Sequence, residues 1–161
     1  MAIGTDSTIR FWGTQDEVTS SAGTLANDTV SANTDIDAWT NDDDAPNATA
    51  TLKYQFDTTM PTAGSIDLYC VLENVQSTND EPDPDVADDD YSKRYLGSFT
   101  INKASNGSPD VDYYDSIEIE LPAGIASSQD MHFFIFNNGT SQTIGTGWQL
   151  WITPWTYGPH G

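Results

Sequence analysis

Residues 51–57 read Thr-Leu-Lys-Tyr-Gln-Phe-Asp and place an apolar side chain at every second position. Leu52, Tyr54 and Phe56 alternate with polar residues, which is the period of a β-strand with one buried and one wet face. Residues 116–121, Ser-Ile-Glu-Ile-Glu-Leu, repeat the pattern. Both stretches predict antiparallel strands that cover a core on one side only.

The same alternation, punctuated by Gly, Pro, Asn and Asp, extends outward over most of the chain, and helical periodicity is nearly absent. The tripeptide Asn137-Asn138-Gly139 is typical of a β-hairpin turn. Further strands are expected over 65–75, 94–103, 130–136 and 147–155, with weaker candidates at 8–12, 23–32 and 36–39. We therefore predict an all-β protein, a single antiparallel, jelly-roll-like β-sandwich of about eight or nine strands.

The domain organisation follows from the polar stretches. Residues 1–23, rich in Thr, Ser and Gly, are predicted to form an extended N-terminal arm. Residues 24–161 are predicted to form the β-sandwich domain, with no internal boundary and no repeat. Within that domain, residues 76–93 form a long acidic loop, and connections of such length are commonly functional or mobile.

The charge balance is strongly acidic, with 25 acidic residues against 5 basic ones and a net charge of −20. Because phosphate affinity depends on clustered Lys and Arg, we expect no nucleic acid as a partner. An anionic membrane surface is disfavoured for the same reason. The acidity is compatible with simple solubility and resistance to self-association, or with a saline or cation-rich setting.

Residue patterns that support catalysis are missing from the sequence. His132 and His160 are the only histidines, no serine lies in a nucleophile-elbow pattern, and no glycine-rich phosphate loop is present. Cys70 is the single cysteine and lies in an apolar run, so we expect a buried, inert thiol. We predict that the protein is not an enzyme and uses no cofactor.

The acidic loop carries seven carboxylates within the eleven residues 80–90. Calcium prefers such oxygen-rich loops, although the spacing is not that of an EF-hand. Mutually repelling, solvated carboxylates are the other interpretation, and both stay open. The candidate metal ligands are Asp83, Asp85, Asp88, Asp89 and Asp90.

Aromatic residues gather near the end of the chain. If strand alternation holds, Trp148 points to one face, and Trp151 and Trp155 point to the other. One set would belong to the core, and the other could cover a sheet edge, dock a partner or form a platform for sugars. The candidate interface residues are Trp151, Trp155, Tyr157, Arg10 and Trp12.

Residues 64–72, Gly-Ser-Ile-Asp-Leu-Tyr-Cys-Val-Leu, resemble a strand motif of small phage virion proteins. The resemblance continues in the same order through the segments at 94–99, 121–122, 134–140 and 147–155. It covers roughly residues 50–157, and these motifs are strand and turn signatures rather than catalytic ones. The acidic loop and the Trp-rich end depart from the pattern, which leaves the docking surface open.

The resemblance implies a jelly-roll-like structural protein, a decoration or cement protein on the outer surface of the phage head. It implies the major capsid protein and copies of the chain itself as partners, with the chain bridging capsid subunits. A charge of −20 would be repelled by packaged DNA, which favours the outer surface. The first ten residues contain no apolar stretch, so we expect synthesis in the host cytoplasm without a signal peptide. The alternative is a tail or fibre accessory protein that binds host-surface glycans.

Overall fold

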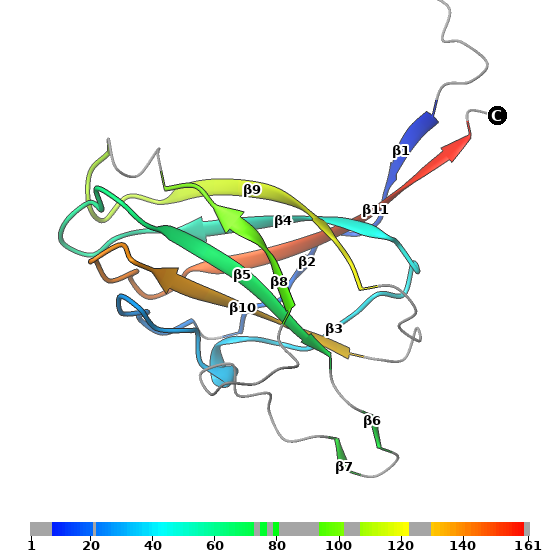
Figure 1. The fold of residues 1–161 in the computed structure, drawn as a ribbon, viewed down its shortest axis with the longest axis horizontal. Coiled ribbons are helices and arrows are strands. Elements are labelled where there is room, and N and C mark those ends of the chain that lie inside the picture. The colour runs from blue at the N-terminus through cyan, green and yellow to red at the C-terminus, as the bar shows by residue number, and fades with distance from the viewer. Residues whose placement is uncertain are drawn as a thin grey trace, which may run out of the picture.

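The structure, a computed structural model, is an all-β sandwich of two antiparallel sheets (Figure 1), which confirms the predicted fold class. It describes residues 8–20, 22–72, 75–76, 79–80, 94–101, 107–122 and 130–159. Within these ranges the helical content is a single 3₁₀ turn, η1 (Asn33–Asp35). No helix in the described part of the chain is long and apolar enough to cross a membrane.

The two sheets have four principal strands each. The first sheet has the order β1 (Thr8–Trp12), β11 (Gln149–Pro159), β4 (Asn47–Tyr54) and β9 (Tyr113–Glu120), and β2 (Asp16–Glu17) also pairs with β11. The second sheet has the order β3 (Trp39–Thr40), β10 (Asp130–Asn138), β5 (Ser65–Leu72) and β8 (Arg94–Phe99). Among the strands of the two main sheets, successive strands lie in different sheets except for β1 and β2, which both pair with β11, and β5 and β8, which are neighbours. With β1 and β2 taken as one strand, this order is that of a jelly roll.

The hairpin predicted at Asn137-Asn138-Gly139 is wrong, because β10 and β11 on either side of it lie in different sheets. Gly139 does adopt a positive φ of 64°, as a tight turn requires. A turn sequence fixes only the local reversal of the chain. Which strands pair is decided by the faces that must be buried, so β10 pairs with β5 while β11 pairs with β4.

The extended arm predicted over residues 1–23 differs from the structure in its described part. Residues 8–12 and 16–17 form β1 and β2, and both pair with β11. Val18 is buried in the core and Thr19 bridges to Ile36. The physical reason is that the edge of β11 needs backbone partners, which this segment supplies. Residues 1–7 and 21 lie outside the described residues.

Part of the predicted acidic loop over residues 76–93 forms a short antiparallel pair, β6 (Val75–Gln76) with β7 (Asn79–Asp80). This pair lies beside the two main sheets in Figure 1 and is hydrogen-bonded to neither of them among the described pairings. The five candidate metal ligands lie outside the described residues: Asp83, Asp85, Asp88, Asp89 and Asp90.

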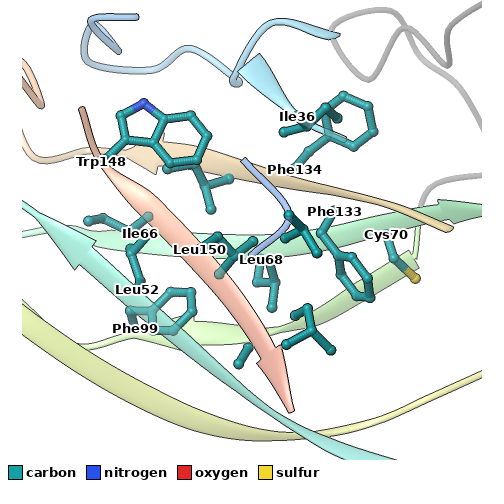
Figure 2. Packing of buried hydrophobic residues seen from close by; sticks show 14 of the residues in the cluster. Ile36, Leu52, Ile66, Leu68, Cys70, Phe99, Phe133, Phe134, Trp148 and Leu150 are labelled. Atoms are coloured by element: carbon teal, nitrogen blue, oxygen red, sulfur yellow. The ribbon is translucent and has the colours of Figure 1, made fainter. Parts of the chain in front are cut away.

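The apolar side chains of the alternating pattern form the core. Along β4 every second residue is buried, and Leu52 has no exposed surface. Figure 2 shows Leu52 and Leu150 of the first sheet pointing toward Ile66 and Leu68 of the second. Each fully buried side chain of this size stabilises the fold by roughly 1.5–3 kcal/mol. The apolar layer between the sheets therefore fixes which face of β4 is available at the surface.

One polar side chain is fully buried in this layer and holds three segments together. The Asn137 amide nitrogen donates to the Leu25 carbonyl at 3.1 Å and to the Gln142 carbonyl at 2.8 Å. The Asn137 side-chain oxygen accepts a hydrogen bond from the Thr140 hydroxyl. Asn137 thus connects the end of β10, the turn after it and the segment around Leu25.

We predict that Asn137→Ala lowers the free energy of unfolding by about 2–3 kcal/mol, because two carbonyls and one hydroxyl lose a buried partner. Chemical denaturation monitored by tryptophan fluorescence measures this. The matched control is Asn47→Ala, on the outer face of β4, with an expected change of less than about 0.5 kcal/mol. Equal losses in the two variants would contradict the assigned role.

Cys70 is a free, buried cysteine, as the sequence predicts. Burial raises the pKa of its thiol from 9.0 to about 11, and the nearby Arg94 lowers it by less. Because its pKa is higher in the folded protein, the thiol keeps its proton over a pH range in which the unfolded chain has already lost it. Its stabilising contribution is complete below pH 9 and is lost as the pH rises toward 11.

The free energy of unfolding should consequently decrease between pH 9 and about 11, because the unfolded chain releases the thiol proton while the folded protein retains it. Cys70→Ala should show a smaller decrease over the same interval, whatever its absolute stability. Denaturation curves recorded at several alkaline pH values compare the two slopes. Identical slopes would show that the Cys70 thiol is not desolvated in the folded protein.

Candidate functional site

β11 extends beyond the sandwich and takes β1 with it. Residues 149–155 of β11 pair with β4, whereas residues 156–159 pair with β1 alone among the described pairings. The register runs from Trp12 opposite Trp155 to Thr8 opposite Pro159. Figure 1 shows the two strands projecting together past the other strands. We call β1 and residues 155–159 the β1–β11 ribbon.

A β-bulge marks the place where this ribbon leaves the sheet. Trp12 lies opposite Trp155, and Asp16 lies opposite Ile152, so the N-terminal strand has one residue more than β11 between these pairs. Such a bulge bends the strand and increases its twist. Pro154 lies between the part of β11 that pairs with β1 and the part that pairs with β2. The missing N–H of this proline therefore interrupts no backbone pair with either strand.

Gly13 leaves room for a close approach at this point. Its backbone N–H donates to the Pro154 carbonyl at 2.8 Å. A Cβ atom on Gly13 would lie 2.3 Å from the Asp43 carboxylate and 2.8 Å from the Pro154 ring, so a side chain there would displace its neighbours. The glycine lets the 42–44 loop approach the ribbon closely and thereby places Asp43 beside it.

One face of the ribbon carries three aromatic side chains arranged around a guanidinium group. Because directly opposite residues share a face, Trp12, Trp155, Arg10 and Tyr157 lie together. The Arg10 guanidinium carbon lies 3.8 Å from the ring centre of Trp155, with Trp12 at 5.1 Å and Tyr157 at 5.6 Å. We call these four residues the aromatic cluster. The other three cover Trp155, which is only 5% exposed although it lies outside the core cluster.

Arg10 also attaches the ribbon to the far edge of the first sheet. Its guanidinium donates to the Glu118 carboxylate at 2.6 Å and to the Tyr157 hydroxyl at 3.2 Å. These bonds, that to Glu118 first, raise the pKa of Arg10 above its already high ordinary value. Glu118 belongs to β9, so the ion pair crosses the outer face of the sheet from one edge strand to the other. The Arg10 charge is therefore balanced within the protein.

The opposite face of the ribbon is apolar and uncovered. Ile9 is 39% exposed and Phe11 is 52% exposed, and the Phe11 ring lies against the backbone of Gly158. Trp12 and Tyr157 on the first face are also more than half exposed. Of the seven large, exposed apolar side chains in the described part of the chain, these four belong to the ribbon. A concentration of this kind on a small surface is typical of an interaction site.

A pocket opens between the ribbon and the 42–44 loop. It has a volume of about 240 Å³ and combines aromatic residues with the Asp43 carboxylate. Its lining consists of Phe11, Trp12, Gly13, Asp43, Ala45, Pro154, Trp155 and Thr156. We call it the Phe11–Asp43 pocket. An adjoining pocket shares Asp43 and Pro154 and adds Asp16 and Asp42, with Asp16 accepting a hydrogen bond from the Trp39 indole at 3.1 Å.

The structure brings together four of the five interface residues predicted from the sequence: Arg10, Trp12, Trp155 and Tyr157. Trp151 is half-buried on the same face, four residues earlier on β11, opposite Glu17 and Thr51. Trp148 belongs to the core, and its indole N–H donates to the Gly23 carbonyl at 3.1 Å. The prediction that Trp148 points to one face and that Trp151 and Trp155 point to the other is thus confirmed.

Sequence reasoning missed Phe11 and Asp43. The sequence predicts residues 8–12 only as a weak strand candidate, and it does not single out Phe11. Phe11 is exposed because the ribbon leaves the sandwich, a property that no local pattern encodes. Asp43 belongs to an Asp-Asp-Asp loop that is distant in the sequence from both ribbon strands. Among the described residues, no group of three or more His, Cys, Asp and Glu side chains is placed to hold a metal ion.

In comparisons with known proteins, no family model matches this chain, and no curated protein is significantly similar to it.

We predict that Arg10→Ala exposes Trp155, because the guanidinium group is the closest cover over its ring. Acrylamide quenching of tryptophan fluorescence should increase, and the Trp155 indole hydrogen should exchange faster with solvent. Lys53→Ala is the control, since it removes the ion pair to Asp112 at 3.4 Å without touching the ribbon. If both variants left Trp155 equally protected, Arg10 would not be what orders the aromatic cluster.

Proposed function

We propose that this protein is a structural component of a phage particle, a decoration or cement protein on the outer surface of the head. It bridges neighbouring major capsid subunits and is present in many copies. It acts by binding, without a catalytic step or a cofactor. The observation that carries the proposal is the β1–β11 ribbon, which exposes Trp12 and Tyr157 on the face of the ordered aromatic cluster and Ile9 and Phe11 on the opposite face.

The ribbon has the properties that a docking element needs. Trp12 and Tyr157 present large apolar surfaces, and Trp, Tyr and Arg are the residues most often found at interface hot spots. Their positions are fixed beforehand by Trp155 and Arg10, so little side-chain freedom is lost on binding. In addition, β1 has no strand on its outer edge among the described pairings, which leaves backbone groups for a partner.

The charge and the sequence motifs support the same proposal. A net charge of −20 is repelled by packaged DNA, which favours the outer surface of a shell. The segments at 64–72, 94–99 and 147–155 resemble those of small phage virion proteins. These segments form β5, β8 and most of β11 of the jelly roll.

A second candidate function is binding of host-surface glycans by a tail or fibre accessory protein. The observation that favours it is the adjoining pocket, where Thr14 and Thr40 lie with Asp16 and Asp42 beside Trp39. Hydroxyl and carboxylate groups beside planar rings can recognise sugars. Asp42 lines this pocket and is exposed, so Asp42→Ala is the variant that tests this candidate. Loss of binding on a glycan array would support it.

We expect purified virions to contain this protein in copy numbers comparable to those of the major shell protein, as measured by quantitative mass spectrometry. Particles that lack the protein should bind it when it is added back. The double variant Trp12→Ala/Tyr157→Ala should bind at least about tenfold more weakly, because two exposed aromatic anchors are removed.

The control for this experiment is Tyr114→Ala, which removes an equally exposed aromatic side chain from β9, away from the ribbon. It should bind to the particles as the wild type does. A handful of copies per virion would contradict the decoration role and favour the tail. A phage that lacks the protein separates the candidates further: heads that burst on heating indicate cement, and failure to adsorb indicates a receptor-binding role.

A further inference from the structure

The Asp43 carboxylate is an exposed charge beside the ribbon. It lies against Gly13 and lines the Phe11–Asp43 pocket, and it has no ion pair or side-chain hydrogen bond among the described residues. The chain has only 5 basic residues for 25 acidic ones. The nearest cation on the ribbon, Arg10, is already bonded to Glu118. The pocket therefore combines aromatic walls with a carboxylate that this protein does not neutralise.

The aromatic cluster shows which chemistry suits such a surface. Arg10 lies over Trp155 and within reach of Trp12 and Tyr157, in an arrangement where a guanidinium group is attracted to aromatic faces. Trp12 and Trp155 contribute to both the cluster and the pocket. A second cation in the pocket would meet the same type of residue, with Asp43 in place of Glu118 as its counter-charge.

We propose that the Phe11–Asp43 pocket receives a lysine or arginine side chain from the partner protein. This inference rests on the proposed function, because it specifies the chemistry of the surface on which the ribbon docks. The aliphatic part of the partner side chain packs against Phe11, and its cationic end pairs with Asp43. The adjoining Asp16 and Asp42 make the local potential more negative and attract a basic partner during encounter.

Charge decides between the alternative occupants. A second copy of this chain also carries −20, so its acidic surface would be repelled at this place. A neutral sugar would leave Asp43 without a counter-charge, although it would gain from stacking. A basic side chain satisfies the carboxylate and the aromatic residues at once, which is why it is the occupant that we infer.

The test is a titration of the ¹⁵N-labelled full chain with N-acetylarginine amide, followed by NMR. We expect saturable shifts of the Trp12 indole N–H and of the Gly13 and Asp43 backbone amides. The neutral analogue N-acetylcitrulline amide should cause none. Asp43→Asn should weaken binding about threefold to tenfold, because the ion pair is lost while the shape is kept.

Asp44→Asn is the matched control, since it removes the same charge from the same loop at a residue that does not line the pocket. Asp44 has a positive φ of 49°, which asparagine tolerates equally well. Binding by Asp44→Asn should equal that of the wild type. Equal weakening in both variants, equal shifts with the citrulline analogue, or the absence of saturable shifts would overturn the inference.

Titration with an N-acetylglucosamine oligomer tests the alternative that the pocket binds a glycan. Saturable shifts of Trp12 with the sugar but not with the arginine amide would overturn the inference in favour of a glycan site. The copy number in virions is measured separately. A high copy number with an unresponsive pocket removes only this inference, whereas a responsive pocket with a low copy number removes the decoration role.

Discussion

The pairing of β11 on both of its edges is the constraint on which the rest of the structure depends. β4 occupies one edge along residues 149–155, and β2 and β1 occupy the other in succession. Leu150 and Ile152 face the core, so the hydrophobic layer fixes the orientation of the whole strand. Because the side-chain period of a strand is two, this orientation also places Trp155 and Tyr157 on the outer face.

β11 continues past its last pair with β4, and β1 pairs with this extension to form the projecting ribbon. The N-terminal segment has one extra residue between β1 and β2, where Gly13 donates to the Pro154 carbonyl. The close approach of Asp43 to Gly13 ties the 42–44 loop to the same point. Three distant segments of the chain thus meet where the sandwich ends. An interaction surface at such a place can reach a partner while the core remains undisturbed.

Electrostatics gives this surface its character. The chain has only 5 basic residues, and one of them, Arg10, lies over the Trp155 ring with Glu118 as its counter-charge. Exposed ion pairs contribute little to stability, so the significance of this one lies in ordering the aromatic side chains. Ordered rings beside carboxylates that lack an ion-pair partner among the described residues are the observation from which we propose a basic partner.

The sequence by itself determined the all-β architecture and the inward face of its best strands, because alternation is a local property and 51–57 and 116–121 express it without interruption. It also separated Trp148 from Trp151 and Trp155 by simple parity. Tertiary structure alone decided that β1 pairs with the end of β11, and that β10 and β11 are not a hairpin. Strand partners are chosen by long-range burial of faces and satisfaction of backbone groups, and neither is encoded in a short window of residues. For the same reason, Arg10, Trp12 and Tyr157 could be named as interface candidates in advance, whereas their meeting with Phe11 and Asp43 required the folded chain.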